Sequence, residues 1–139
     1  MRARLERMSL RLVASTVVAL LVLAGCGSPD EEAADGRSLT VTLAAGEYFF
    51  RADEAFELRA GDEVTFVVRN EGELDHRLEV LSASSSSLGR TERVAPGAQR
   101  EVTVTFDEPG TYRVICDVDD HLSRGQQAGF EVGPPAATG

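Results

Sequence analysis

From Ser38 onward, apolar and polar residues alternate in short segments, the spacing expected of β-strands with one buried face. These segments are rich in Val, Thr, Phe and Tyr, and short groups containing Gly, Pro, Asn or Asp separate them. No stretch of this region repeats its apolar residues at helical spacing. The predicted strands are SLTVTLAA, DEVTFVVRN, HRLEVL, REVTVTF, TYRVIC and GFEV. The pattern therefore predicts an all-β domain built as a sandwich or barrel.

The alternation also assigns a direction to the polar residues within these strands. In HRLEVL, His76 shares its face with Leu78, and in TYRVIC, Cys116 shares its face with Val114. Because the apolar partners define the buried face, both His76 and Cys116 are predicted to point inward at strand ends. Such positions lie at one pole of a sandwich, where loops on a rigid frame commonly build a site.

Residues 1–25 have a different composition. Four arginines lead into an uninterrupted run of apolar and small residues that ends at Cys26, as in a secretory signal peptide. The run is shorter than the roughly 20 residues that a membrane-spanning helix needs. Its end, Leu-Ala-Gly-Cys, resembles the lipobox of bacterial lipoproteins, in which the cysteine is lipidated and becomes the first mature residue. We therefore expect an extracytoplasmic protein that Cys26 anchors to the cell membrane.

The remaining chain divides by composition into three parts. Residues 26–37 are small and acidic without apolar periodicity, which indicates a flexible tether. Residues 38–132 carry the strand pattern and suffice for one domain with one core. Residues 133–139 are expected to form a disordered tail. Within the domain, the serine-rich stretch 82–87 is interpreted as a low-complexity loop.

The charge of the chain restricts its partners. From Cys26 onward it has 10 arginines, no lysine and 22 acidic residues. This balance argues against nucleic acid as a partner, because phosphate binding needs a basic surface. Acidic surface keeps a protein soluble and attracts cationic partners.

The few histidines of the chain and its remaining cysteine form a candidate set of metal ligands. The chain has two histidines, His76 and His121, and a lipidated Cys26 would leave Cys116 without a disulfide partner. Two imidazoles and one thiolate suit copper, because thiolate is a soft ligand and imidazole suits both oxidation states. The four residues between Cys116 and His121 allow both side chains to reach one ion. We expect His76 to reach it from a strand of the facing sheet.

Two segments around these residues resemble the metal-bearing segments of the cupredoxin family: NEGELDHRLEV and PGTYRVICDVDDHLSRGQ. The family pattern is an N-x-G turn before the first histidine, then G-T-Y-x-x-x-C, a short loop, a second histidine, and an axial Met or Gln. The resemblance covers residues 38–132 and implies a Greek-key β-sandwich of about seven to eight strands. It also implies one type 1 copper ion, with His76, Cys116 and His121 as the strong ligands.

Several positions depart from the family pattern. Both methionines lie in residues 1–25, so the axial ligand is expected to be a glutamine. Counting forward from His121 favours Gln126, whereas counting back from Gly129 favours Gln127, and we prefer Gln126. The residue after the first histidine, often Asn in the family, is Arg77. Carboxylates that would favour oxidised copper occupy loop positions where the family commonly has Pro or Gly: Asp117, Asp119 and Asp120.

The resemblance implies a membrane-anchored electron carrier that exchanges single electrons with a redox partner protein. We expect no enzymatic activity, because multicopper oxidases and nitrite reductases need further domains and histidines. Two alternatives remain open at this point. One is copper handling, as a chaperone or storage protein. The other is a binding domain without a redox role, since residues 76–116 also resemble the cupredoxin-like domain of periplasmic iron-uptake lipoproteins.

Overall fold

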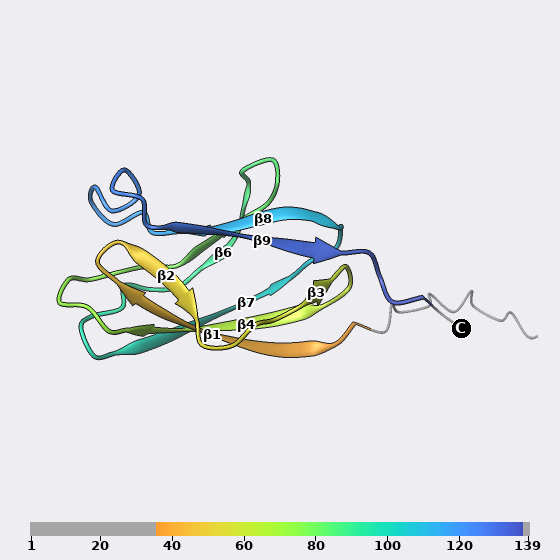
Figure 1. Ribbon diagram of the computed structural model, residues 1–139, viewed down its shortest axis with the longest axis horizontal. Helices are drawn as coiled ribbons and strands as arrows, with labels where there is room; N and C mark the ends of the chain where they lie inside the picture. Colours follow the sequence, from red (N-terminus) through yellow and green to blue (C-terminus); the bar gives the residue numbers. More distant parts are fainter. Residues whose placement is uncertain (1–35, 138–139) are drawn as a thin grey trace, which may run out of the picture. The chain divides into compact units, whose positions relative to one another are not determined.

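The structure, a computed structural model, describes residues 36–137, which form two β-sheets packed face to face (Figure 1). The predicted signal peptide, Cys26 and most of the predicted tether lie outside the described residues. The four-stranded sheet has the order β2 (Phe49–Ala52), β1 (Ser38–Gly46), β4 (Glu63–Asn70) and β7 (Gln99–Thr105). The five-stranded sheet has the order β3 (Leu58–Arg59), β9 (Gln127–Gly133), β8 (Gly110–Ile115), β5 (Glu79–Leu81) and β6 (Ser87–Arg90).

The predicted all-β sandwich is confirmed, and each of the six segments chosen from the alternation contains a strand. The nine strands of the described region exceed the expected seven to eight because β2, β3 and β6 have only two to four residues each. Segments that short cannot display a recognisable alternation. Strand β6 begins at Ser87, the last residue of the predicted serine-rich loop. No helix in residues 36–137 is long and apolar enough to cross a membrane.

Two strand pairings decide which loops meet at the same end of the sandwich. Strands β1 and β4 are parallel, with Ala45 opposite Asn70, so the segments that follow these two strands leave the sheet at the same end. Strands β5 and β8 are antiparallel, with Glu79 opposite Ile115, so the segment before β5 lies beside the segment after β8. The segment after β4 is also the segment before β5, so three segments lie at one end of the sandwich, which we call the site end: 47–48, 71–78 and 116–126.

The core between the sheets is apolar and aromatic. Strand β4 buries every second residue, including Phe66, which is fully buried at its centre. Phe66 meets Phe106 edge to face with ring centroids 6.3 Å apart, and Phe106 meets Tyr112 in the same way at 4.8 Å. The hydroxyl of Tyr112 donates a hydrogen bond of 2.7 Å to the carbonyl of Glu108. The same buried cluster includes Leu78 and Cys116, so the core reaches the site end.

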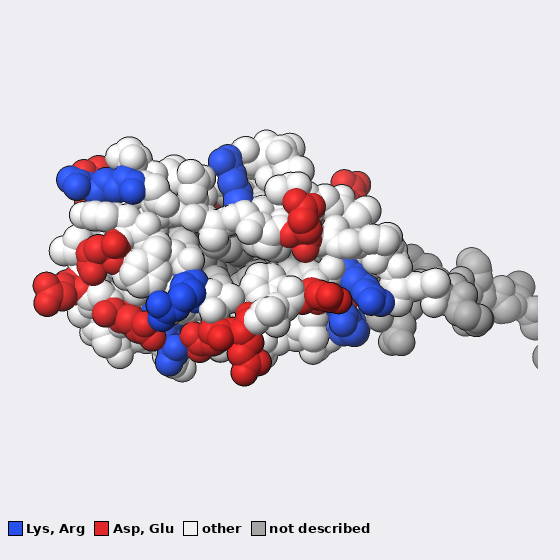
Figure 2. All heavy atoms as spheres, in the orientation of Figure 1, with Lys and Arg blue, Asp and Glu red and all other residues white. Residues whose placement is uncertain are grey.

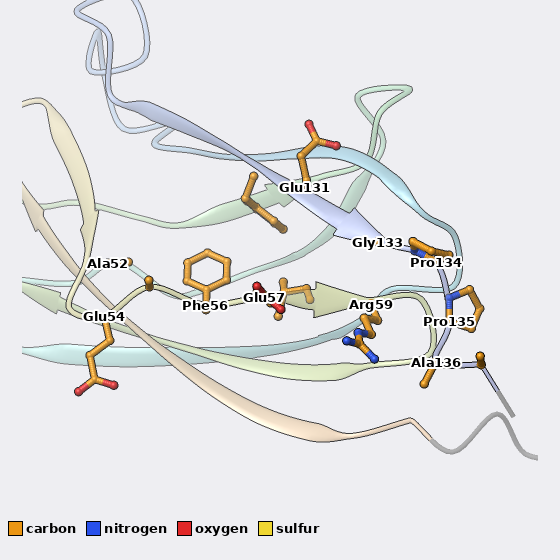
Figure 3. Close-up of a pocket in the computed structure, with 14 residues that line it drawn as sticks. Ala52, Glu54, Phe56, Glu57, Arg59, Glu131, Gly133, Pro134, Pro135 and Ala136 are labelled. Atoms are coloured by element: carbon orange, nitrogen blue, oxygen red, sulfur yellow. The ribbon is translucent and has the colours of Figure 1, made fainter. Parts of the chain in front are cut away.

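A pocket of about 690 Å³ lies away from the site end, between the segment after β2 and the C-terminal end of β9 (Figure 3). Phe56, Arg59 and Pro134 are among the residues that line it, together with several carboxylates and small apolar residues. None of its lining residues is a histidine or a cysteine. The residues able to bind a soft metal ion therefore lie elsewhere, at the site end.

Candidate metal centre

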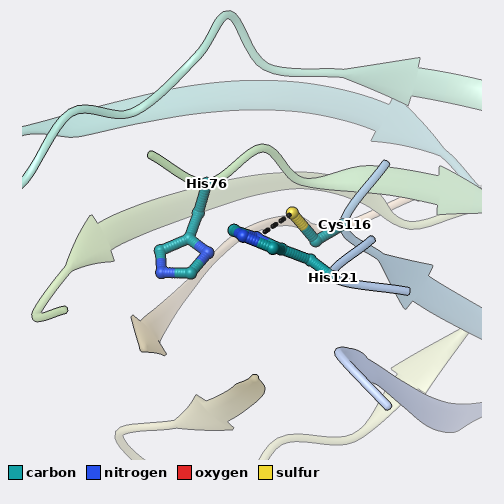
Figure 4. A group of neighbouring side chains, drawn as sticks. All are labelled: His76, Cys116 and His121. Atoms are coloured by element: carbon teal, nitrogen blue, oxygen red, sulfur yellow. Dashed lines mark hydrogen bonds between the residues drawn. The ribbon is translucent and has the colours of Figure 1, made fainter. Parts of the chain in front are cut away.

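His76, Cys116 and His121 converge at the site end (Figure 4). One potential ligand atom from each residue lies within 4.8 Å of the others. All three residues are buried, with exposed fractions of 0%, 0% and 3%, so water is largely excluded from the space between them. The predicted inward direction of His76 and Cys116 is confirmed.

The route by which His76 reaches the cluster differs from our expectation. His76 directly precedes β5, and β5 pairs with β8, the strand that leads into Cys116. The expectation that His76 comes from the facing sheet is therefore wrong. Alternation alone shows that a residue is buried, but it does not show which sheet its strand joins.

The backbone of His76 is held by a short bridge and by the side chain of Asn70. The His76 amide donates to the carbonyl of Val94 at 3.1 Å, and the Val94 amide donates back at 2.8 Å. The buried Asn70 donates through Nδ2 to the carbonyls of Leu74 and Val94, and its Oδ1 accepts from the Gly72 amide. The N-x-G turn thus fixes the segment that carries the first histidine.

The loop of residues 117–126 is closed by its own backbone. The Cys116 amide donates to the carbonyl of Gln126 at 3.1 Å, and the Gln126 amide donates to the carbonyl of His121 at 3.0 Å. Gly125 has a φ of 99°, a backbone conformation that side-chain-bearing residues rarely adopt. This closure brings the Sγ of Cys116 to within 3.6 Å of the Nδ1 of His121.

Gln126 completes the cluster. Its side chain is fully buried, and its Nε2 donates to the carbonyls of Gly46 and Phe49 at 3.0 and 3.2 Å. The other amide atom, Oε1, consequently faces the cluster and lies 2.9 Å from the Nδ1 of His76. Gln127, the alternative axial residue, is exposed at the start of β9. The structure brings Gln126, and not Gln127, to the three other residues.

The four donors fit one copper ion. A buried set of two imidazoles and one thiolate, with a weak amide oxygen beside them, is characteristic of type 1 copper sites. The Nδ1 atoms of both histidines are directed at the same space as the Cys116 sulfur, and the Gln126 oxygen borders that space. Burial lowers the pKa of His76, while the hydrogen bond with Gln126 raises it. The neutral imidazole that a metal requires is therefore favoured by burial.

Arg77 occupies the position where the family often has Asn, and it braces the cysteine loop in another way. Its Nε and NH2 donate to the two carboxylate oxygens of Asp117 at 2.6 and 2.8 Å. This bond holds the pKa of Arg77 above its ordinary value. The pair extends the β5–β8 register by two positions beyond Glu79 and Ile115. It therefore ties the histidine segment directly to the residue after Cys116.

Two residues of the β1–β2 turn complete the surroundings, and sequence reasoning missed both. The ring of Tyr48 meets His121 edge to face, with centroids 5.2 Å apart, and Arg124 lies over the Tyr48 ring. The carboxylate of Glu47 lies 3.6 Å from the Nε2 of His76. No spacing motif links this turn to the ligands. The parallel pairing of β1 with β4 brings the turn to the site end.

In the described residues, a two-sheet β-sandwich buries two histidines, a cysteine and a glutamine at one end, which is the architecture of a small metal-binding domain. The family model described as "Cupredoxin-like domain" matches residues 16–126, most of the chain. The chain therefore belongs to the cupredoxin-like family, and the resemblance seen in the sequence is confirmed. No curated protein matches the chain in sequence.

Solved structures agree on the fold. The reduced auracyanin of Roseiflexus castenholzii is 20% identical, with a TM-score of 0.60 over 71% of this chain and 100% of its own. Auracyanin A of Chloroflexus aurantiacus is 21% identical, with a TM-score of 0.58 over 69% of this chain and 99% of its own. Reduced rusticyanin is 18% identical, with a TM-score of 0.53 over 70% of this chain and 80% of its own. At these identities, the similarity concerns the shared sandwich.

Proposed function

We propose that this protein binds one copper ion through His76, Cys116 and His121, with Gln126 as a weak axial ligand, and transfers single electrons. The observation that carries the proposal is the burial of all four donors around one space, each held by backbone hydrogen bonds or packing. Bound there, copper would supply the change of oxidation state. A site held in this way favours electron transfer because its ligands need little rearrangement between the two states.

The residues of the chain would perform three tasks in such a carrier. The Cys116 thiolate would donate electron density to the ion, and the two imidazoles would suit both of its oxidation states. Gln126 would keep its oxygen toward the ion because two carbonyls hold its amide nitrogen. Tyr48 and Arg124 would exclude water from His121. Auracyanin A, which shares the fold, is described as a blue copper protein, and this supports the proposal.

The surface of the site end supports transient docking of a redox partner. Two exposed leucines lie beside the ligands, Leu74 before His76 and Leu122 directly after His121. Acidic side chains outnumber basic ones in the chain and are numerous on the face seen in Figure 2. We therefore propose a weakly bound partner with a basic surface around an apolar contact. A lipid on Cys26 would hold the protein at the outer face of the cell membrane, where such a partner could reach it.

The visible spectrum with Cu(II) tests the copper proposal. Residues 27–139 are purified without metal and titrated with Cu(II), and we expect an intense visible band from the Cys116 thiolate together with reversible one-electron reduction. Cys116→Ser should abolish the band, and His121→Ala should alter it without changing the β-type far-ultraviolet circular dichroism. A colourless wild-type protein would contradict the electron-transfer proposal. Rapid loss of Cu(I) to a chelator after reduction would instead favour copper handling.

The proposed membrane anchor has its own test. Cys26→Ser should prevent lipid attachment, so the variant should leave the membrane fraction or keep its N-terminal segment uncleaved. Mass spectrometry of the mature N-terminus distinguishes the lipidated form from an unmodified one. Cys116→Ser is the matched control, because it removes a thiol without touching the Leu-Ala-Gly-Cys motif. Identical processing and membrane retention of Cys26→Ser would refute the anchor.

A further inference from the structure

The outer nitrogen of His76 stands out among the polar atoms of the site end. While Nδ1 of His76 faces the other ligands, Nε2 is buried and lacks a hydrogen-bond partner within the described part of the chain. A buried polar atom without a partner costs stability, so its presence in a native site calls for an explanation. Oε1 of the charged Glu47 side chain lies 3.6 Å from this nitrogen. A small movement of either side chain would bring the two into hydrogen-bonding distance.

Backbone hydrogen bonds fix the position of the Glu47 carboxylate. Its Oε1 accepts hydrogen bonds from the amides of Glu73 and Leu74, at 2.7 and 2.9 Å, in the loop that leads to His76. These bonds hold the pKa of Glu47 below its ordinary value, so the side chain is an anion at neutral pH. The carboxylate is thus tied to the same loop whose histidine it approaches.

The absence of a side chain at Gly72 leaves the space that the Glu47 carboxylate occupies. A β-carbon at position 72 would lie 2.3 and 2.6 Å from the two carboxylate oxygens of Glu47, closer than atoms can approach. The backbone of Gly72 does not have a positive φ, so a side chain there would act through space alone, by forcing the Glu47 carboxylate to move. The N-x-G turn therefore has a second task beyond turning the chain, which is to admit the Glu47 carboxylate.

We propose that Glu47 is a positioning residue of the metal centre, whose carboxylate accepts the Nε2–H of His76 and thereby directs the Nδ1 lone pair toward the ion. This inference rests on the proposed metal site. A neutral imidazole carries a single N–H, so an Nδ1 bound to metal requires the proton on Nε2. A carboxylate that accepts that proton fixes the tautomer and orients the ring. Its negative charge also favours the more highly charged, oxidised ion.

The test compares three variants of the full chain with a matched control. Glu47→Ala removes the acceptor, Glu47→Gln keeps an oxygen but removes the charge, and Gly72→Ala displaces the carboxylate while keeping its charge. Glu73→Gln is the control, because it removes the same charge from an exposed position nearby, whereas the carboxylate paired with His76 in the described residues is that of Glu47. Circular dichroism and thermal unfolding of the metal-free proteins establish that each variant folds.

Zinc serves as the first probe, because it reports on ligand orientation without redox chemistry. Glu47→Ala and Gly72→Ala should bind Zn(II) about tenfold to a hundredfold more weakly than wild type, with Glu47→Gln between them and wild type. Nitrogen-detected NMR of the zinc-loaded wild type should show a slowly exchanging Nε2–H on His76. That proton should exchange faster in Glu47→Ala and Gly72→Ala, while Glu73→Gln should match the wild type in both measurements.

Measurements with copper distinguish a failure of this inference from a failure of the proposed function. With copper bound, Glu47→Gln and Glu47→Ala should have a higher reduction potential than Glu73→Gln. If the wild type binds zinc as expected but stays colourless with Cu(II), the electron-transfer proposal fails and the role of Glu47 stands. If Glu47→Ala and Gly72→Ala keep wild-type zinc affinity and Nε2–H exchange, the role of Glu47 is refuted whatever copper does. A wild type that binds neither ion overturns both proposals.

Discussion

At the scale of single residues, the metal centre depends on amide side chains in which hydrogen bonds fix both the nitrogen and the oxygen. Gln126 shows this most clearly, because its amide nitrogen is bonded to two carbonyls and only its oxygen remains for the cluster. Asn70 holds the histidine loop through three hydrogen bonds in the same manner. In Gln126, the hydrogen bonds of the amide nitrogen therefore determine that the oxygen is the atom that faces the cluster.

The axial position offers a test at this scale. An amide oxygen stabilises Cu(II) more than a thioether does, so Gln126→Met should raise the reduction potential of the copper-loaded protein. Cyclic voltammetry of the purified domain measures the change. Gln127→Met is the matched control, because Gln127 is exposed and its replacement should leave the potential unchanged. If only Gln127→Met shifted the potential, the axial ligand would be Gln127.

At the scale of elements, strand pairing places the ligands, and side-chain pairs reinforce the pairing. Arg77 and Asp117 bond across the extension of the β5–β8 ladder, where the two ligand-bearing segments leave the sheet. At the other end, Arg37 before β1 bonds to Asp62 in the turn between β3 and β4. Each pair joins segments that lie at least 25 residues apart in the chain.

The Arg77–Asp117 pair is expected to contribute modestly to stability and more to the metal site. Both side chains are about one-quarter exposed, so a double-mutant cycle of Arg77→Gln and Asp117→Asn should give a coupling free energy of about 1 kcal/mol. Urea unfolding of the metal-free protein measures it. Because the pair adjoins Cys116, both single variants should also broaden or shift the visible copper band. A coupling near zero with unchanged spectra would leave the pair without this bracing role.

The Arg37–Asp62 pair predicts a dependence of stability on pH. The Arg37 guanidinium holds the pKa of the buried Asp62 below its ordinary value of 3.8, although burial opposes the shift. Between the two pKa values the unfolded chain binds a proton that the native protein does not, so stability falls as the pH falls through this window. Asp62→Asn should therefore be less stable than wild type at pH 7, and the difference should shrink below about pH 4. Urea titrations at several pH values test this, and a difference independent of pH would contradict it.

At the scale of the whole molecule, the sandwich core supports the site end. Phe66 lies fully buried in β4 and contacts Phe106 and Phe130, whose rings join the two sheets. Strand β4 ends at Asn70, which holds the histidine loop. Packing at the centre of the sandwich is thus continuous with the segments that carry the ligands.

Phe66→Ala should lower the free energy of unfolding by about 3 to 5 kcal/mol, because it leaves a cavity between the sheets. That is a large part of the stability of a small domain. Bound Zn(II) should recover part of the loss, since a ligand that binds only the native state stabilises it. Thermal unfolding with and without zinc measures both effects. Phe49→Ala, at an exposed position near the site end, is the control and should cost far less. Equal losses from the two variants would contradict this account of the core.

The sequence alone determined the all-β class, the six main strands and the inward direction of His76 and Cys116. Local alternation carries this information, because a strand with one buried face repeats its apolar residues every second position. The family spacing around Cys116 and His121 also marked the ligand loop, since both ends of that loop are close in the chain.

Only the tertiary structure decided which strands are neighbours. It placed His76 in the same sheet as Cys116, brought Arg77 to Asp117 and carried Glu47 to the outer side of His76. It also separated Gln126 from Gln127, which are adjacent in sequence but differ completely in burial. These contacts depend on the parallel pairing of β1 with β4 and the antiparallel pairing of β5 with β8. Alternation leaves the order of strands open, because every buried strand presents the same pattern of apolar residues whichever neighbour it joins.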